Sequence, residues 1–351
     1  MSLAELRIEN LRCVEAAALE FSPELNLIAG ENGAGKTSIL EAIFLLGRGR
    51  SFRTRTSERL IRQGQAALTV FGRTHDVPSQ TAGIEVSREG TRARVNGADV
   101  QTLLDLSGVL PVQAIDPEIH KLIEQGPERR RRWLDWLVFH VEPSFVGHWT
   151  RYQRGLKQRN AALRAGQHDV AIWDQALVEH GQEITRARQA ALSRLEPYLA
   201  KLLDAFAGLE LNLGFHAGWG HDHSLAEQLR INADRDRERG LTHSGPHRAD
   251  VVLRTKGRTA RETLSRGQQK LAAVAMIIAQ LRLLQDEQGM RAVLLLDDPA
   301  AELDEKNLQR LFVELSSLRS QMIATSLTPE TALFQAPKAT FHVEQGRVVR
   351  L

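Results

Sequence analysis

The chain has 351 residues, 42% apolar and 25% charged, which is enough for one large domain or two average ones with a substantial core. Its single cysteine, Cys13, excludes an internal disulfide and a cysteine-built metal site. The chain has no long apolar run, and its N-terminal "MSLAELRIEN" carries charges, so we expect a cytoplasmic protein with no membrane partner. The net charge is +3, and 38 of the 46 basic residues are arginine, which suits phosphate recognition, although a codon bias also explains this composition.

The first functional element in chain order is a phosphate-binding loop in "LNLIAGENGAGKTSILEAIFLL". Residues 25–29 are typical of a strand and residues 38–46 of a helix, and between them Gly30, Gly35, Lys36 and Thr37 match G-x-x-x-x-G-K-[ST] in full. In such a loop backbone N–H groups bind phosphate oxygens, the lysine reaches the β- and γ-phosphates, and the hydroxyl binds Mg²⁺. No G-x-G-x-x-G is present, which argues against a dinucleotide site. We therefore expect ATP and Mg²⁺ as cofactors, with nucleotide contacts from Gly30, Glu31, Asn32, Gly33, Ala34, Gly35, Lys36, Thr37 and Ser38.

A basic segment, "GRGRSFRTRTSERLIRQG", follows the predicted helix. Because of its place near the nucleotide, Arg50 and Arg53 are candidate DNA contacts that link the nucleotide state to DNA, and a plain surface loop is the alternative. The next two segments, "ALTVFGRTHD" and "TAGIEVSREGTRARVNG", alternate polar and apolar residues around turn dipeptides such as Asn96-Gly97. This pattern predicts antiparallel strands without chemistry of their own.

Residues 116–207 read as a helical arm, with Pro143, Gly166 and Pro197 as expected interruptions. Between residues 127 and 165 there are nine basic and three acidic residues, a composition typical of a DNA-contacting surface. A solvated or internally salt-bridged face is an equal alternative. The DNA candidates in this arm are Arg129, Arg151, Arg154, Lys157 and Arg159. For the aromatic residues among them we favour packing over stacking on bases: Trp133, Trp136, Trp149 and Tyr152.

The segment "THSGPHRAD" holds two histidines, His243 and His247, at a spacing that would suit a metal site on a helix. Gly245 and Pro246 between them break any helix, so we expect a turn before a strand at residues 251–254 and no protein metal site. The pattern by itself gives this segment no function.

A helix is predicted next, in "TLSRGQQKLAAVAMIIAQL", from an apolar stripe at helical spacing that runs from Leu271 to Leu281. Its first turn holds Ser265, Gly267 and Gln268, small or amide residues that bring hydrogen-bonding groups close to a surface. Because the unpaired N–H groups of a helix start attract anions, this turn is a candidate phosphate contact.

The last predicted site element is an apolar strand at residues 293–296 in "RAVLLLDDPAAELD". Asp297 and Asp298 follow it, at the end of the strand where open α/β sheets bind ligands. We expect Asp297 to bind Mg²⁺ and Asp298 to orient the attacking water.

The three motifs in this order resemble the ABC-type ATPases, since Ser265, Gly267 and Gln268 resemble the LSGGQ signature of that superfamily. The resemblance implies a homodimer with two ATP molecules, each held between the P-loop of one subunit and the signature of the other, and a β-lobe beside the adenine. It also gives roles to three more positions: Gln113 as the glutamine that senses Mg²⁺ and γ-phosphate, Asp304 as the residue that reaches across the dimer, and Thr325 in place of the switch histidine.

Two features separate the chain from transporter subunits of that superfamily. Lys36 and Ser265 are 229 residues apart, a much longer interval than in transporters. The intervening sequence also differs from SMC proteins, because it shows no long heptad array. Asp298 stands where transporters carry glutamate, one methylene longer, which predicts slow hydrolysis.

Over essentially its full length the chain resembles the RecF family of bacterial recombination mediator ATPases, in "GENGAGKTS", "GRGRSFRT", "LPVQAIDPEIHKLIEQGPERRRRWLDW", "LKQRNAALR", "THSGPHRADV", "LSRGQQK" and "LLLDDPAAELD". The resemblance implies a slow, DNA-stimulated ATPase that dimerises on ATP at the nucleoid. It also implies binding to gapped or junction DNA and cooperation with RecR and RecO in loading RecA during gap repair and the SOS response.

The expected fold class is α/β, with an ABC-type head in which a mixed sheet is flanked by helices and joined by an antiparallel β-lobe. We expect the head at residues 1–115 and 208–351, and an inserted helical lobe at 116–207. Two other functions are weighed against this one. A structural SMC-like chromosome-binding ATPase would need long coiled coils, and a transporter ATPase subunit would need a membrane partner.

Overall fold

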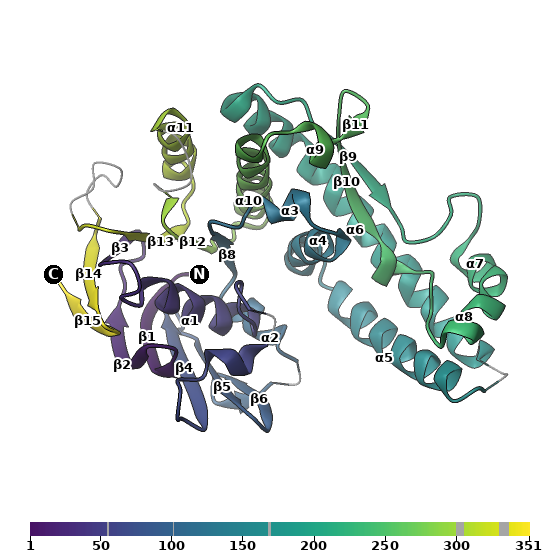
Figure 1. Ribbon diagram of the computed structural model, residues 1–351, viewed down its shortest axis with the longest axis horizontal. Coiled ribbons are helices and arrows are strands. Elements are labelled where there is room, and N and C mark those ends of the chain that lie inside the picture. The colour runs from purple at the N-terminus through teal and green to yellow at the C-terminus, as the bar shows by residue number, and fades with distance from the viewer. Residues whose placement is uncertain (55, 101, 168–169, 300–304, 330–336) are drawn as a thin grey trace. The chain divides into compact units, whose positions relative to one another are not determined.

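The computed structural model describes the whole chain except residues 55, 101, 168–169, 300–304 and 330–336. The described residues form two compact units (Figure 1). The first comprises Met1–Ile119 and Gln285–Leu351, and the second His120–Leu284. None of the described helices is long and apolar enough to cross a membrane.

The first unit contains an antiparallel sheet in the strand order β2-β1-β4-β5-β6-β7. Its strands are β1 (Leu3–Leu11), β2 (Val14–Glu20), β4 (Ala67–Thr74), β5 (Thr81–Ser87), β6 (Gly90–Val95) and β7 (Ala98–Asp99). Asn96 and Gly97, with φ of 50° and 83°, form the tight turn between β6 and β7. The predicted antiparallel strands and this turn are therefore confirmed.

The second sheet of this unit is mixed, with the order β15-β14-β3-β13-β12-β8. Its strands are β3 (Leu25–Ala29), β8 (Val112–Ile115), β12 (Val293–Leu296), β13 (Gln321–Ser326), β14 (Ala339–Glu344) and β15 (Arg347–Arg350). All neighbours are parallel except β14 and β15. Because β13 separates β3 from β12, the carboxyl ends of these three strands lie side by side, and this arrangement positions the site.

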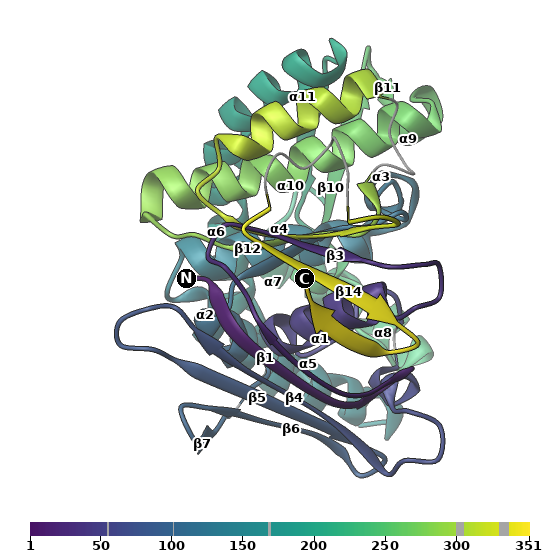
Figure 2. The same cartoon turned by 90° about the vertical axis from the view of Figure 1, so that its left-hand side faces the viewer.

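The long helix of the first unit, α1 (Lys36–Arg48), packs between the two sheets (Figure 2). Its residues Ile39, Ile43 and Leu46 belong to one apolar core with side chains from both sheets. The shorter helices of this unit are η1 (Ser57–Leu60), α2 (Asp105–Val109) and α11 (Glu305–Ser316). The apolar side chains of α1 thus fix this helix, which directly follows the P-loop, against both sheets.

The second unit is mainly helical, with one small antiparallel sheet in the order β11-β10-β9. Its strands are β9 (Asn212–His216), β10 (Asp250–Thr255) and β11 (Arg258–Thr259). Its helices are α3 (Lys121–Glu124), α4 (Pro127–Val141), α5 (Phe145–Arg164), α6 (Ala171–Ala207), α7 (Leu225–Ile231), α8 (Ala233–Arg239), η2 (Pro246–Arg248), α9 (Ala260–Thr263) and the start of α10 (Arg266–Gln288). Residues 208–284, which we assigned to the head, continue this unit because β9 and β10 pack on α6 and α4.

Two helices differ from their sequence pattern. Pro197, expected to interrupt the arm, lies inside α6, because the buried residues Leu195, Leu199 and Leu202 hold the helix on both sides of it while its own ring is exposed. In α10 burial is not confined to the predicted stripe, since Ala272, Ala273 and other intervening residues are buried too. The helix is therefore surrounded by protein over its middle.

Candidate nucleotide-binding site

The P-loop connects β3 to α1 in the first unit, as its sequence pattern predicts. Gly30 has a φ of 155°, and a Cβ atom there would collide with the carbonyl oxygen of Val343, so only glycine fits. The turn after β14 supports the loop, because the N–H of Gly346 donates to the carbonyl of Ala34 over 2.8 Å. The loop is therefore held in one conformation by its own glycines and by a neighbouring strand.

Lys36, the first residue of α1, lies inside the loop and is 8% exposed. Its Nζ donates to the carbonyls of Gly30, over 2.6 Å, and Glu31, over 2.9 Å. Burial lowers the pKa of Lys36, while the charges of Asp298 and Asp297 oppose that shift. This ammonium group faces two carboxylates, an arrangement suited to a polyphosphate with bound Mg²⁺.

The carboxylate of Asp297 meets two hydroxyl groups at the carboxyl edge of the mixed sheet. Its Oδ1 accepts hydrogen bonds from the Oγ1 of Thr37, over 2.9 Å, and from the Oγ1 of Thr325, over 3.1 Å. Asp297 is 9% exposed, and burial raises its pKa, against the effects of both threonines and of the Arg53 charge. The predicted magnesium ligands Thr37 and Asp297 thus converge, which fits a metal that takes few protein oxygens and shares phosphate oxygens.

The second carboxylate, Asp298, is held by its backbone. Its N–H donates to the Oγ1 of Thr325 over 2.8 Å, and its φ is 46°, a left-handed conformation that is costly for a residue other than glycine. Thr325 therefore touches both acidic positions at once. Among the described residues, no group of three or more His, Cys, Asp and Glu side chains is arranged to hold a metal ion.

Three residues near the site carry no motif and are absent from the sequence prediction. Glu41, fully buried on α1, pairs with Arg12 (Nε to Oε2, 2.6 Å) and accepts a hydrogen bond from Ser51 Oγ over 2.5 Å. Ser51 Oγ in turn accepts from the N–H groups of Arg53 and Thr54, over 2.9 and 3.0 Å. A carboxylate on the apolar face of "SILEAIFLL" was the available signal. We call Arg12, Glu41 and Ser51 the Glu41 anchor.

The Glu41 anchor fixes the basic segment that follows α1. Arg53 is exposed, and its charge lowers the pKa of Asp297, which places it within electrostatic reach of the site. Arg50 is half-buried. Whether either arginine contacts DNA stays a prediction.

Two further predicted residues of the first unit are placed only in part. Gln113 is buried on β8 with its backbone in register with Leu294 of β12, so it lies on the strand next to the one that Asp297 follows. Its role toward Mg²⁺ stays a prediction. Asp304 lies outside the described residues.

The predicted signature residues lie at the start of α10 in the second unit. Ser265 and Gln268 form a reciprocal cap, because the N–H of Gln268 donates to Ser265 Oγ over 3.3 Å and the N–H of Ser265 donates to Gln268 Oε1 over 3.0 Å. Ser265 and Gly267 are exposed, and a Cβ atom on Gly267 would have no neighbour within 4 Å. This helix start is thus capped and open to a ligand.

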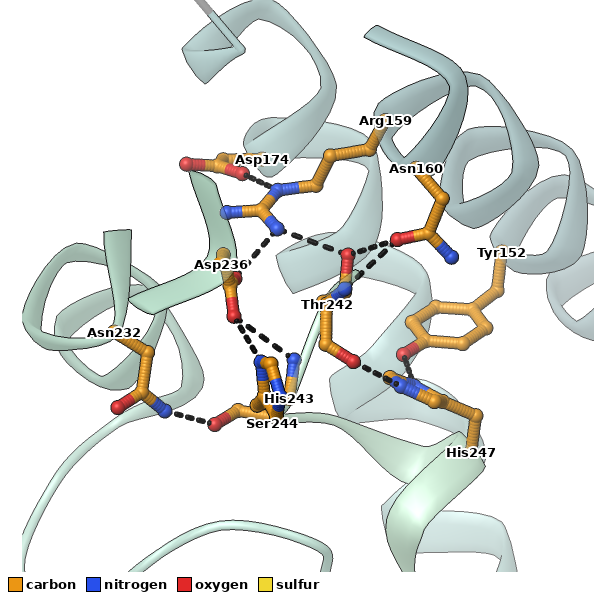
Figure 3. Close-up of polar contacts among 10 residues, drawn as sticks. All are labelled: Tyr152, Arg159, Asn160, Asp174, Asn232, Asp236, Thr242, His243, Ser244 and His247. Atoms are coloured by element: carbon orange, nitrogen blue, oxygen red, sulfur yellow. Dashed lines mark hydrogen bonds and ion pairs between the residues drawn. The ribbon is translucent and has the colours of Figure 1, made fainter. Parts of the chain in front are cut away.

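The predicted DNA contacts of the helical arm differ in how exposed they are. Arg151, Arg154 and Lys157 are exposed on α5, whereas Arg129 is half-buried and bonds Gln125. Arg159 is fully buried, where it pairs with Asp174 and Asp236 (Figure 3). The prediction of Arg159 as a DNA contact is therefore corrected, because two carboxylates, one of them 77 positions away in the sequence, hold its guanidinium inside the unit. Trp133, Trp136 and Tyr152 are also buried, as expected from packing: all three belong to the core.

The P-loop, the carboxylates after β12, the mixed sheet and the antiparallel sheet together define the head of an ABC-type ATPase. Residues 2–348 match the family model described as the RecF/RecN/SMC N-terminal domain. The chain is 40% identical over 361 residues to the DNA replication and repair protein RecF of Cellvibrio japonicus, and 39% identical over 356 residues to that of Shewanella baltica, with 99% of both chains covered in each pair.

A solved structure of the recombination mediator protein RecF-ATP in the RecFOR pathway is also similar, with a TM-score of 0.90 and 26% identity over 100% of this chain and 97% of that one. The chain therefore belongs to the RecF family within the RecF/RecN/SMC group. The resemblance and the fold class expected from the sequence are confirmed.

Proposed function

We propose that this protein is a Mg²⁺-dependent ATPase that dimerises on ATP and binds gapped or junction DNA during gap repair and replication-fork recovery. The observation that carries the proposal is the convergence of Lys36, Thr37, Asp297 and Thr325 at the ends of three parallel strands. The names of the relatives, DNA replication and repair proteins, support the biological setting. Action on DNA would place the protein at the nucleoid.

Each residue of the site has a defined task in this proposal. The N–H groups of the P-loop and the ammonium group of Lys36 bind the phosphates, while Thr37 and Asp297 hold Mg²⁺. When bound there, Mg²⁺ would stabilise the negative charge of the phosphates. Asp298 orients the attacking water, and Thr325 holds the carboxylate of Asp297 and the backbone N–H of Asp298 beside the γ-phosphate. Gln113 assists in sensing Mg²⁺.

The two catalytic positions favour slow hydrolysis. Asp298 is one methylene shorter than a glutamate, and its strained backbone limits how its carboxylate can adjust. Thr325 donates a hydrogen bond but carries no positive charge. ATP therefore serves as a timed lock on the dimer, and hydrolysis releases it.

The open start of α10 supports a dimer in which Ser265, Gly267 and Gln268 contact the γ-phosphate on a second copy, and Asp304 reaches the same interface. The exposed side chains Arg151, Arg154 and Lys157 provide the DNA-binding face. The RecFOR pathway named for the similar structure supports cooperation with RecR and RecO. The loading of RecA through them is what the resemblance to the family implies.

Sedimentation of the wild type with ATP, with ADP and without nucleotide tests this proposal. We expect a dimer only with ATP, and a monomer throughout for Ser265→Arg, because the added side chain fills the space that the phosphate would occupy. Gln288→Arg, at the exposed other end of α10, adds the same charge as a control and should dimerise normally. A dimer formed equally with ADP, or by Ser265→Arg, would contradict the ATP lock.

A further inference from the structure

Helix α5 has two chemically different faces. Arg151, Arg154 and Lys157 point to solvent, whereas Tyr152 and Arg159 are fully buried within the second unit. Both sets come from the same two turns of helix, so any rigid movement of one face moves the other. The buried face contacts residues 242–249, the turn segment "THSGPHRA", here called the 242–249 loop.

Tyr152 holds this loop through His247. The hydroxyl of Tyr152 lies 2.7 Å from Nδ1 of His247, and Nε2 of His247 lies 3.0 Å from the carbonyl oxygen of Thr242 (Figure 3). Burial raises the pKa of Tyr152 and lowers the pKa of His247 to about 4. At neutral pH the tyrosine is therefore protonated and donates to Nδ1, while the neutral imidazole donates from Nε2 to Thr242.

Arg159 and Asn160 hold the beginning of the loop. Nη1 of Arg159 donates to Asp236, over 2.6 Å, and to Oγ1 of Thr242, over 2.9 Å. Oδ1 of Asn160 accepts from both the N–H and the hydroxyl of Thr242, over 2.8 and 2.7 Å. Asp236 also accepts from the N–H and Nδ1 of His243. Thr242 thus has all its polar groups occupied by α5 and by the loop itself.

The rest of the loop is equally constrained. Nη1 of Arg188 donates to the carbonyl of Pro246 and Nη1 of Arg131 to that of Ala249, each over 2.7 Å. Gly245 has a φ of 133°, and a Cβ atom there would collide with the Tyr152 hydroxyl. Removing one partner of a buried ion pair such as Arg159–Asp236 would leave the other charge unpaired, so the pair opposes movement of the loop away from α5.

The loop leads directly to the signature residues. Its last residue precedes β10, which pairs with β11, and α9 then packs on β10 and ends two residues before Ser265. The position of the loop therefore sets the position of the short hairpin that delivers the chain to the start of α10. Each of these contacts lies within the second unit.

We propose that Tyr152, Arg159 and Asn160 are positioning residues that couple DNA held on the exposed face of α5 to the start of α10. This inference rests on the proposed function, because it uses the predicted DNA contacts of α5 and the predicted phosphate contact of Ser265. Phosphate contacts with Arg151, Arg154 and Lys157 shift α5, the buried anchors shift with it, and the 242–249 loop transmits the movement to Ser265.

The experiment compares ATP hydrolysis with and without gapped DNA in the wild type, Tyr152→Phe and Asn160→Ala. Each variant removes contacts to the loop and leaves the exposed basic side chains in place. We expect the basal rate and the DNA affinity to stay within about twofold of wild type, while the acceleration by DNA falls at least about fivefold, the low end of usual coupling between sites. Ser224→Ala, which removes the cap of α7 without touching the loop, is the matched control and should keep the full acceleration.

The outcomes separate this inference from the function on which it rests. A wild type that DNA does not accelerate would overturn both the DNA-stimulated ATPase and the coupling. An accelerated wild type with equally accelerated Tyr152→Phe and Asn160→Ala would overturn the coupling alone, as would a parallel loss of DNA affinity. Tyr152→Phe keeps the ring and its packing, so a thermal melt that matches wild type shows that this variant is folded. If Tyr152→Phe does not fold, the acceleration of Asn160→Ala by DNA tests the coupling.

Discussion

At the scale of single residues, Thr325 organises the catalytic end of the site. Its hydroxyl donates to Asp297 and accepts from the N–H of Asp298, so one side chain sets the position of both acidic residues. A histidine could not make these two contacts with one atom. Thr325, which stands in place of the switch histidine of transporters, therefore has a structural role in the site.

Thr325→Val keeps the shape of the side chain and removes its hydroxyl. We expect hydrolysis to slow about 10–100-fold, the factor for losing a hydrogen bond to a charged group, with little change in ATP binding. Burial raises the pKa of Asp297 and the Thr325 hydrogen bond opposes this, so the pKa rises further in the variant. Because Mg²⁺ needs the ionised carboxylate, the acid limb of the pH profile of kcat/KM moves to higher pH.

A pH–rate series with Thr340→Val, a hydroxyl on β14 of the same sheet, as control measures this effect. The control should follow the wild-type profile. An acid limb that stays in place or moves to lower pH in Thr325→Val would show that the hydroxyl does not stabilise the ionised form of Asp297.

Glu41→Gln tests the Glu41 anchor. The amide keeps one acceptor for Ser51 but loses the charge that pairs with Arg12, whose side chain is 32% exposed. Because solvent screens part of that pair, we expect the free energy of unfolding to fall by about 1–3 kcal/mol. Urea unfolding measures it, and Glu20→Gln, an exposed partner of Arg350 at 4.0 Å, should leave stability unchanged. If the free energy of unfolding falls no more than in the control, the Glu41–Arg12 pair does not stabilise the protein.

How much of the site the sequence predicts depends on the range of each interaction. The P-loop and the two aspartates are fixed by neighbours in sequence and by strand ends, so their pattern is readable. The Glu41 anchor joins residues up to 39 positions apart, from Arg12 to Ser51, and no local pattern shows it. The sequence does not predict the burial of Arg159 for the same reason, because its partners Asp236 and Thr242 are 77 and 83 positions away.

At the scale of elements, strand bounds follow the apolar runs closely, since β3 and β12 coincide with the predicted residues 25–29 and 293–296. Both runs are short, continuous and buried, and the polar residues after them stop the strand. Helix interruptions are less predictable, because packing along a long helix outweighs one unfavourable residue. Pro197 within the 37 residues of α6 is the example.

Pro197→Ala should therefore stabilise the protein. Alanine restores a backbone hydrogen bond and removes the ring clash, worth about 3 kcal/mol, and gives the unfolded chain more freedom, which costs up to about 1 kcal/mol. We expect the free energy of unfolding in urea to rise by about 2 kcal/mol. A decrease would mean that the native packing of α6 requires the bend that proline introduces.

At the scale of the whole molecule, the near balance of 46 basic and 43 acidic residues hides an uneven distribution. Several arginines of the helical arm form ion pairs within the second unit: Arg130 with Asp250, Arg188 with Asp135, and Arg159 with Asp174 and Asp236. Composition alone therefore overestimates the surface available to DNA. The exposed face of α5 is what remains of the predicted basic stripe on that helix.

Arg154→Glu tests that face. Each phosphate contact of a duplex contributes about 0.9 to the slope of log affinity against log salt, so the variant should bind gapped DNA more weakly and with a slope shallower by about one. ATP binding to the P-loop should not change, because the P-loop and Asp297 lie in the other unit. Arg186→Glu, a charge reversal at an exposed position of α6, is the control and should leave the slope near that of wild type. Fluorescence anisotropy across a salt series measures the slope for both variants. Equal slopes would mean that α5 does not face the DNA and that its exposed charges serve only solvation.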